Sequence, residues 1–285
     1  MKKIFVILLC SYMLPVMAWN ATGHRIVANI AYQHLTPQAK NFIQESLYPA
    51  QSHASLNTRF ANAAVWADFI KSKGIKKYNK WHYIDIPYQR GLDEAKAPML
   101  PNIRSALAQS IAKLKDRTLS QSERVFYLRF LIHLVGDAHQ PLHCSTLYDP
   151  MFPQGDAGGN LYLLKNAYGE SLHGFWDRGL GLLGNPYKSY AWKRENAKML
   201  RTKKRNLIEK LQQKFPESLL LEAKDLNPEH WIAESHQLAE SFVYSVPVHT
   251  SPSRTYVKKG KEVVQRQLVL AGYRLAYLLN EIARE

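Results

Sequence analysis

The 285-residue sequence has few cysteines, few strand-like stretches and little uninterrupted apolar sequence. Its two cysteines, Cys10 and Cys144, exclude a disulfide scaffold. Beyond residue 18, no apolar run reaches the roughly 18 residues that suggest a transmembrane helix, so we expect no stable membrane anchor. Strand-like extended pieces are limited to 83–86 and 162–164. The core is therefore expected to come from helices.

The first 18 residues have the features of a secretory signal peptide. Lys2 and Lys3 precede an apolar stretch over 4–14, and small residues at Val16 and Ala18 suit cleavage after Ala18. The sequence thus predicts a secreted or periplasmic protein that begins at Trp19. Cleavage would also remove Cys10. Cys144 would then remain, either as a metal ligand beside a histidine or as a small apolar core residue.

Helical periodicity dominates the rest of the chain. Apolar residues recur at three- and four-residue spacing over 24–34, 58–73, 102–115, 121–139, 228–246 and 261–283. Long connections over 86–101, 146–160 and 248–260 are rich in Pro, Gly, Asp and Ser, and such loops often carry function. We therefore predict one all-α domain over 19–285 with long loops across one face.

Acidic residues are scarce relative to basic ones, at 23 against 38. Removal of Lys2 and Lys3 would lower the formal charge of +15 by two, to +13. Basic residues concentrate over 188–214, where they form either a phosphate-binding surface or a solvated helix face. The charge permits nucleic acid, an anionic membrane surface or phosphorylated small molecules as partners, without choosing among them.

Among eleven histidines, the densest group lies in residues 133–143. His133 and Asp137 are four residues apart on a predicted helix, so both side chains lie on one face, and Pro141 ends that helix before His143. His173 and Asp177 repeat the spacing. One such pair is typical of surface ion pairs, but two pairs with an extra histidine favour a multinuclear metal site. Imidazole and carboxylate without thiolate suit catalytic zinc.

Several motifs in this order resemble those of the zinc-dependent single-strand nuclease/3′-nucleotidase family, which shares a fold with the zinc phospholipases C. These motifs are Trp19-Asn-Ala-Thr-Gly-His24, Val65-Trp66-Ala-Asp68, Trp81-His82-Tyr-Ile-Asp85, the 133–143 run, Gly158-Gly159-Asn160, Leu172-His173-Gly-Phe-Trp-Asp177 and, near the end, 274–280. The resemblance implies the all-α phospholipase C type of fold. It also implies hydrolysis of single-stranded DNA or RNA to 5′-phosphate products and removal of phosphate from 3′-nucleotides.

The resemblance further implies three zinc ions. One would be held by Asp68, His82 and His133, its close partner by His24 with the α-amino and carbonyl groups of Trp19, and the third by His143, His173 and Asp177. Asp137 would bridge the close pair, and a metal-bridging hydroxide would be the nucleophile. Asp68 and Lys71 are the residues expected to contribute to catalysis.

Substrate contacts are implied at four positions. Lys71 would contact phosphate, although the sequence alone also allows a solvated lysine, and Tyr83 would stack on an unpaired base unless it is a core residue. Asp85 and Asn160 match base-side positions. His139 belongs to the 133–143 motif without being a ligand, and we expect it to hydrogen-bond around the metal ligands.

Two other functions remain open. A zinc phospholipase C would use similar metals, but that group resembles a pattern with glutamate at the last ligand position, where this chain has Asp177. A secreted basic nucleic-acid-binding protein could use metals for stability alone. The near-complete ligand set favours the nuclease, which we expect to act as a monomer on single-stranded nucleic acid and 3′-nucleotides.

Overall fold

The computed structural model describes residues 19–47, 54–92, 95–165, 167, 171–184 and 197–285. The predicted signal peptide and the first part of the basic segment, 188–196, lie outside the described residues. In the described part, no helix is both long enough and apolar enough to cross a membrane.

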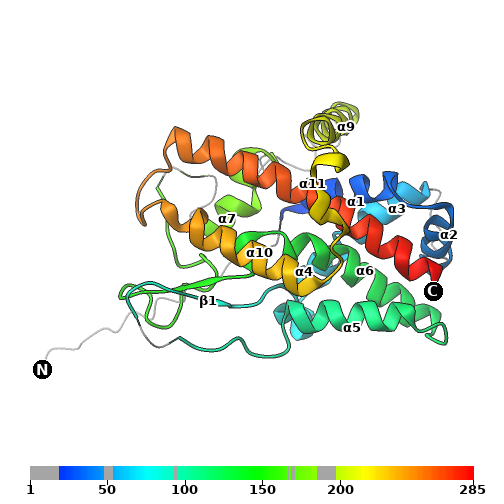
Figure 1. The fold of residues 1–285 in the computed structure, drawn as a ribbon, viewed down its shortest axis with the longest axis horizontal. Coiled ribbons are helices and arrows are strands. Elements are labelled where there is room, and N and C mark those ends of the chain that lie inside the picture. Colours follow the sequence, from blue (N-terminus) through cyan, green and yellow to red (C-terminus); the bar gives the residue numbers. More distant parts are fainter. Residues whose placement is uncertain (1–18, 48–53, 93–94, 166, 168–170, 185–196) are drawn as a thin grey trace, which may run out of the picture.

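The described chain is built from helices (Figure 1), which confirms the all-α expectation. The α-helices are α1 (Ala21–Gln33), α2 (Pro37–Ser46), α3 (Leu56–Ala63), α4 (Trp66–Ser72), α5 (Ile103–Lys115), α6 (Gln121–Ala138), α7 (Leu172–Asp177), α9 (Ala197–Lys214), α10 (Pro228–Ser241) and α11 (Arg254–Arg284). Short 3₁₀ helices are η1 (Lys76–His82), η2 (Pro141–His143), η3 (Gly179–Gly181), η4 (Glu217–Leu219), η5 (Leu221–Lys224) and η6 (Val243–Ser245). Two three-residue strands, β1 (Pro87–Gln89) and β2 (Thr146–Tyr148), pair in parallel.

The centre of the fold is the 31-residue helix α11, which packs along α1 and also contacts α2 and α6 (Figure 1). Its buried face includes Leu268, Ala271 and Leu275. Gly272 allows the two helices to approach closely, because a Cβ atom there would lie 2.6 Å from Cγ2 of Ile30. This packing holds α1, and with it the N-terminal end of the described chain, against the core.

Helix caps set the positions of the predicted metal ligands. The Asn20 side chain caps α1 by accepting hydrogen bonds from the Thr22 and Gly23 amides, at 2.9 and 3.2 Å, so His24 lies in the first turn. Ser120 and Glu123 form a capping box at the start of α6. His133 and Asp137 consequently lie one turn apart near its C-terminal end, where both are fully buried.

Three local predictions were wrong. The helix expected over 58–73 is two helices, broken at Ala64 and Val65. This break positions the Ala64 carbonyl to accept a hydrogen bond from Nδ1 of His133 at 2.7 Å. The helix expected over 228–246 ends at Ser241. The segment expected as a loop, 248–260, contains the start of α11 at Arg254. Ser253 caps this helix by accepting a hydrogen bond from the Tyr256 amide.

The extended segment expected at 83–86 lies just before the observed strand β1. The pairing is Pro87 with Thr146, Tyr88 with Leu147 and Gln89 with Tyr148. Two of the predicted long loops, 86–101 and 146–160, are thereby joined side by side. At 162–164 the structure has only an isolated bridge, between Leu163 and Ser171.

Candidate metal centre and adjoining pocket

Three buried groups of histidine and aspartate side chains lie at the N-terminal end of α1 and the C-terminal end of α6, with contributions from α4, η1, η2 and α7. They are His24 with His133 and Asp137; Asp68 with His82 and His133; and His143 with His173 and Asp177. Within each group, one ligand atom per residue lies within 4.8 Å of the others. The structure thus brings together all eight histidine and aspartate side chains that were predicted as metal ligands.

Asp137 stands at the centre of the first two groups. Its Oδ1 lies 3.2 Å from Nε2 of His24, while its Oδ2 lies 3.1 Å from Nδ1 of His82 and 3.2 Å from Nε2 of His133. Asp68 completes the second group, with Oδ1 3.9 Å from Nδ1 of His82 and 3.8 Å from Nε2 of His133. The two Asp137 oxygens therefore point toward different sets of histidines, as a bridging carboxylate requires.

The third group is more separate. Asp177 Oδ2 lies 3.3 Å from Nε2 of His173, and its Oδ1 lies 3.9 Å from Nε2 of His143. Gln140 orients this carboxylate, because its Nε2 donates to Asp177 Oδ1 at 2.7 Å while its own Oε1 accepts from the Leu142 amide at 2.7 Å. The same glutamine thus links the end of α6 to α7.

Backbone carbonyls hold the histidine rings in the orientation that a metal needs. The Nδ1 of His133 donates to Ala64 O, that of His143 to His82 O and that of His173 to Gly158 O, at 2.7, 2.7 and 2.6 Å. This leaves each Nε2 directed into its group, the usual arrangement around a protein-bound metal. Among the described residues, Nε2 of His143 and Oδ1 of Asp68 are buried without a hydrogen-bond partner. These nitrogen and oxygen atoms are suitable ligands for a divalent cation.

The charges of the groups also favour cations. Burial by itself lowers the pKa of His133, but attraction from Asp137 and Asp68 outweighs it and raises that pKa to about 9. The two buried carboxylates therefore favour a positive charge beside His133. Burial lowers the pKa of His143 to about 3, which keeps its imidazole neutral, the form that binds metal. Burial also raises the pKa of Asp177 well above its usual value, and a nearby cation would oppose that shift.

Close packing surrounds the first group. The Trp19 side chain is fully buried, and the next residue, Asn20, donates its backbone amide to the Asp177 carbonyl at 2.9 Å. A Cβ atom at Gly136 would lie 2.8 Å from Nδ1 of His24, so glycine is needed for the His24 ring to reach Asp137. The Asn20 bond thus joins the start of the described chain to the end of α7, and a ligand at the Trp19 backbone stays a prediction of the family resemblance.

Lys71 on α4 is not a freely solvated lysine. Burial lowers the pKa of its ammonium group, and the charges of Asp68, Asp137 and Asp177 act in the opposite direction. Aspartates from all three groups therefore act electrostatically on this ammonium group.

His139 and Cys144 are both fully buried. Within the described chain, the side-chain hydrogen bonds of His139 go to Val135 and Arg274 rather than to the predicted metal ligands, so the expected role of His139 is not seen here. His139 Nδ1 donates to Val135 O at 2.7 Å, and its Nε2 accepts from Nη1 of Arg274 at 3.0 Å. Arg274 in turn pairs with both carboxylate oxygens of Glu234, at 2.7 and 2.8 Å. This network ties the end of α6 to α10 and α11. Cys144 directs its Sγ to Ala138 O, outside the three histidine–aspartate groups, as expected for a small core residue.

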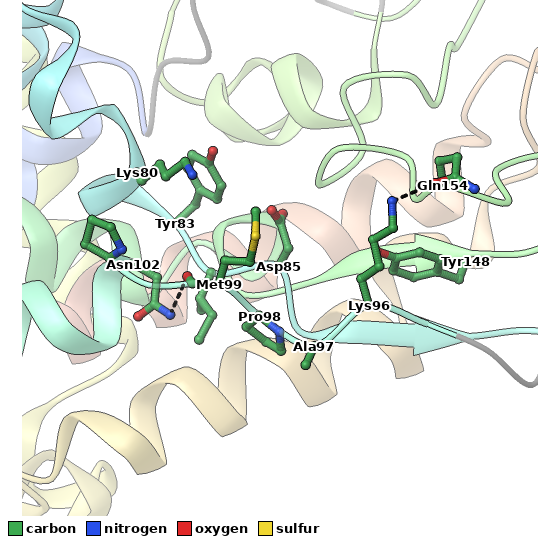
Figure 2. A pocket seen from close by; sticks show the side chains of 12 residues that line it. Lys80, Tyr83, Asp85, Lys96, Ala97, Pro98, Met99, Asn102, Tyr148 and Gln154 are labelled. Carbon is green, nitrogen blue, oxygen red and sulfur yellow. Dashed lines mark hydrogen bonds between the residues drawn. The ribbon is translucent and has the colours of Figure 1, made fainter.

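A pocket of about 210 Å³ lies at the end of η1, the helix whose last residue is the predicted ligand His82 (Figure 2). Tyr83 and Asp85, which follow the ligand His82, both line it. Burial is the main reason that the pKa of Asp85 rises, to about 6, with repulsion from Asp156 adding to it and Lys80 opposing it. Asn160 is not among the lining residues, and its side chain donates to Ala157 O at 2.7 Å.

Sequence reasoning missed Gln140 and the Arg274–Glu234 pair. Gln140 lies inside the histidine-rich motif, so its position was a usable signal, because ligating carboxylates are commonly hydrogen-bonded in turn. Glu234 and Arg274 lie on separate helices, and no local spacing relates them to His139.

The model of the S1/P1 nuclease family matches residues 19–284. Nuclease S1 of Aspergillus oryzae is 27% identical over 286 residues, 94% of this chain and 92% of that protein. Endonuclease 1 of Arabidopsis thaliana is 27% identical over 298 residues, 97% of this chain and 90% of that protein. Nuclease P1 of Penicillium citrinum is 28% identical over 170 residues, and that match spans 57% of its length and 56% of this chain.

The family match thus extends over the three histidine–aspartate groups, the pocket and the central helix. Together with the all-α fold, it places this chain in the S1/P1 nuclease family.

Proposed function

We propose that this protein is a secreted, zinc-dependent nuclease that hydrolyses single-stranded DNA or RNA to 5′-phosphate products and removes phosphate from 3′-nucleotides. The main support for this proposal is the set of three buried histidine–aspartate groups in a chain that matches the S1/P1 nuclease family. Three zinc ions there would supply an activated water and would stabilise negative charge on the phosphate and the departing oxygen.

The residues around the groups divide the remaining work. His24, Asp68, His82, His133 and Asp137 would hold the close pair of ions, with the Trp19 backbone as a further ligand. His143, His173 and Asp177 would hold the third. The carbonyl-bound rings fix the ligand atoms before substrate binds, so little reorganisation is needed during the reaction.

Lys71 and the Tyr83–Asp85 pair would position the substrate. The partly buried Lys71 would contact the phosphate at the metal groups through its ammonium group. Tyr83 would stack on a base, and Asp85 would hydrogen-bond its edge; a paired base could not present its face to the tyrosine ring, which accounts for a single-strand preference. Asn160 remains a proposed base-side contact from the neighbouring loop.

The rival function is a zinc phospholipase C. The two activities separate in a direct assay with single-stranded DNA, 3′-adenosine monophosphate and a phosphocholine ester as substrates. We expect cleavage of the first two by the zinc-loaded protein. Efficient phosphocholine-ester cleavage without nuclease activity would show that the proposed function is wrong.

The substitution His143→Ala tests the ligand assignment within the same assay. This residue offers a buried imidazole with no competing hydrogen bond from the described residues at Nε2. We expect turnover to be lost while binding of single-stranded DNA is largely kept, because the cationic substrate contacts remain. Unchanged turnover in a folded variant would contradict the role assigned to the third group.

A further inference from the structure

The pocket that begins at Tyr83, the residue after the predicted ligand His82, continues past the two residues that the proposed function uses. Figure 2 shows Lys80 beside Tyr83 at one end and Lys96 at the opposite end, with Asp85 and Met99 between them. The Lys96 Nζ donates to Oε1 of Gln154 at 2.7 Å. The pocket therefore carries an ammonium group at each end, and neither belongs to the catalytic arrangement described above.

The far wall of the pocket is built from the two paired loops. Strand β1 leads from Asp85 into the segment that carries Lys96, while β2 ends at Tyr148 and leads to Gln154. Asp156 supports β2, since its carboxylate accepts from Thr146 Oγ1 at 3.1 Å and from the Leu147 amide at 2.9 Å. These bonds hold β2, and Lys96 contacts the loop that follows β2 through Gln154.

The near wall of the pocket is formed by the segment that leads into α5. Asn102, which caps α5, is buried and donates from Nδ2 to Met99 O at 3.1 Å. Pro98 and Met99 thereby present apolar surface to the pocket, and Met99 is 71% exposed. A large exposed apolar side chain beside an aromatic ring and two cations suits a ligand that combines flat apolar faces with anionic groups.

Single-stranded nucleic acid has this combination, because its bases are flat and its linkages are anionic. We propose that the pocket is a subsite for the nucleotides that flank the cleaved bond, in which Lys80 beside Tyr83 and Lys96 at the opposite end contact backbone phosphates. This inference rests on the proposed function. It adds a reason why the protein would prefer single-stranded nucleic acid to a 3′-mononucleotide. A 3′-mononucleotide carries one phosphate, which the metal groups would occupy, so it would not use these lysines.

The test replaces both lysines, as Lys80→Gln with Lys96→Gln. The matched control, Lys76→Gln with Lys224→Gln, removes the same charge from exposed positions outside the pocket lining. The measured quantity is kcat/KM for a short single-stranded oligothymidylate and for 3′-adenosine monophosphate over a series of salt concentrations. Thermal unfolding of each variant verifies that it is folded.

We expect the pocket variant to lose about 3- to 30-fold in kcat/KM on the oligonucleotide at low salt, within the range of two exposed charge contacts. Its logarithmic salt slope should fall by about 1.4, since each single-strand phosphate contact contributes about 0.7. Hydrolysis of the mononucleotide should stay within twofold of wild type. Equal losses on both substrates, or a loss no larger than that of the control, would overturn the subsite.

A binding measurement separates this inference from the proposed function. Anisotropy of a labelled oligothymidylate, recorded in the His143→Ala background, should show weaker binding when both pocket lysines are replaced, and unchanged binding would count against the subsite. Lysine-dependent binding by a wild-type protein that cleaves no phosphodiester would instead support the subsite and refute the nuclease.

Discussion

Replacing Gln140 by methionine should weaken the third metal group without removing any ligand. Gln140 is fully buried, and its Nε2 donates to Asp177 Oδ1 at 2.7 Å. Methionine has a similar length but cannot donate this hydrogen bond. Substitution of residues that orient metal ligands lowers metal affinity by about 10- to 100-fold, equivalent to about 1.4–2.7 kcal/mol. The lost bond to a charged group, worth about 1.5–3 kcal/mol, is of matching size.

A second effect needs to be separated from the first. The Leu142 amide loses its acceptor on Gln140, and a buried donor without a partner costs about 1–3 kcal/mol of stability. Gln267→Met is the matched control, because Gln267 is also buried and donates to the backbone oxygen of His139 at 3.3 Å, and His139 belongs to none of the three histidine–aspartate groups.

The assay is zinc titration against a competing chelator, together with denaturant unfolding of the chelated proteins. Both variants should be less stable than wild type, whereas the affinity of one zinc should fall in the Gln140→Met protein alone. Wild-type zinc affinity in that protein, or an equal fall in the Gln267→Met protein, would refute the role given to Gln140.

Two further predictions concern Asp85 and the N-terminus. The pKa of Asp85 is raised from 3.8 to about 6, so the folded state holds a proton that the unfolded state releases, and stability falls as pH rises through this window. With the metal removed by a chelator, Asp85→Asn should therefore have a free energy of unfolding about 2–3 kcal/mol higher than wild type at pH 8 and nearly equal to it at pH 4. Denaturant unfolding measures this difference. A difference that does not change with pH, or the same gain in the control Glu262→Gln, would contradict the prediction. A protein that retains Ala18 before Trp19 should bind zinc less tightly and cleave more slowly than the processed form; full activity and zinc content in the uncleaved form would contradict a ligand at the Trp19 amine.

Local patterns predicted the helices well where caps and apolar spacing agree. The segment 121–139 matches α6 within one residue at its end, because Ser120, Glu123 and Pro141 mark its limits. The prediction of one helix over 58–73 was wrong because the apolar spacing continues across Ala64 and Val65. The break there frees the Ala64 carbonyl for a hydrogen bond from His133 on another helix, which local spacing does not reveal. The early start of α11 was missed because 248–260 has loop-like composition, although Ser253 is a usable cap.

The candidate site shows the same division. The eight histidine and aspartate ligands were found because helical spacing places His133 with Asp137 and His173 with Asp177, and the family resemblance supplied the rest. That resemblance also led to Tyr83 and Asp85, which line the pocket. It assigned no role to Gln140, Arg274 or Lys96, whose partners lie 37 or more residues away along the chain.

The sequence by itself determined the helical class, the family and the ligand types, since these depend on local spacing and on motifs in a fixed order. The tertiary structure decided which oxygen of Asp137 faces which histidine, which carbonyls orient the rings and how two distant loops enclose a pocket with a lysine at each end. The physical reason is that these features depend on contacts between segments remote in sequence, which local propensity does not encode.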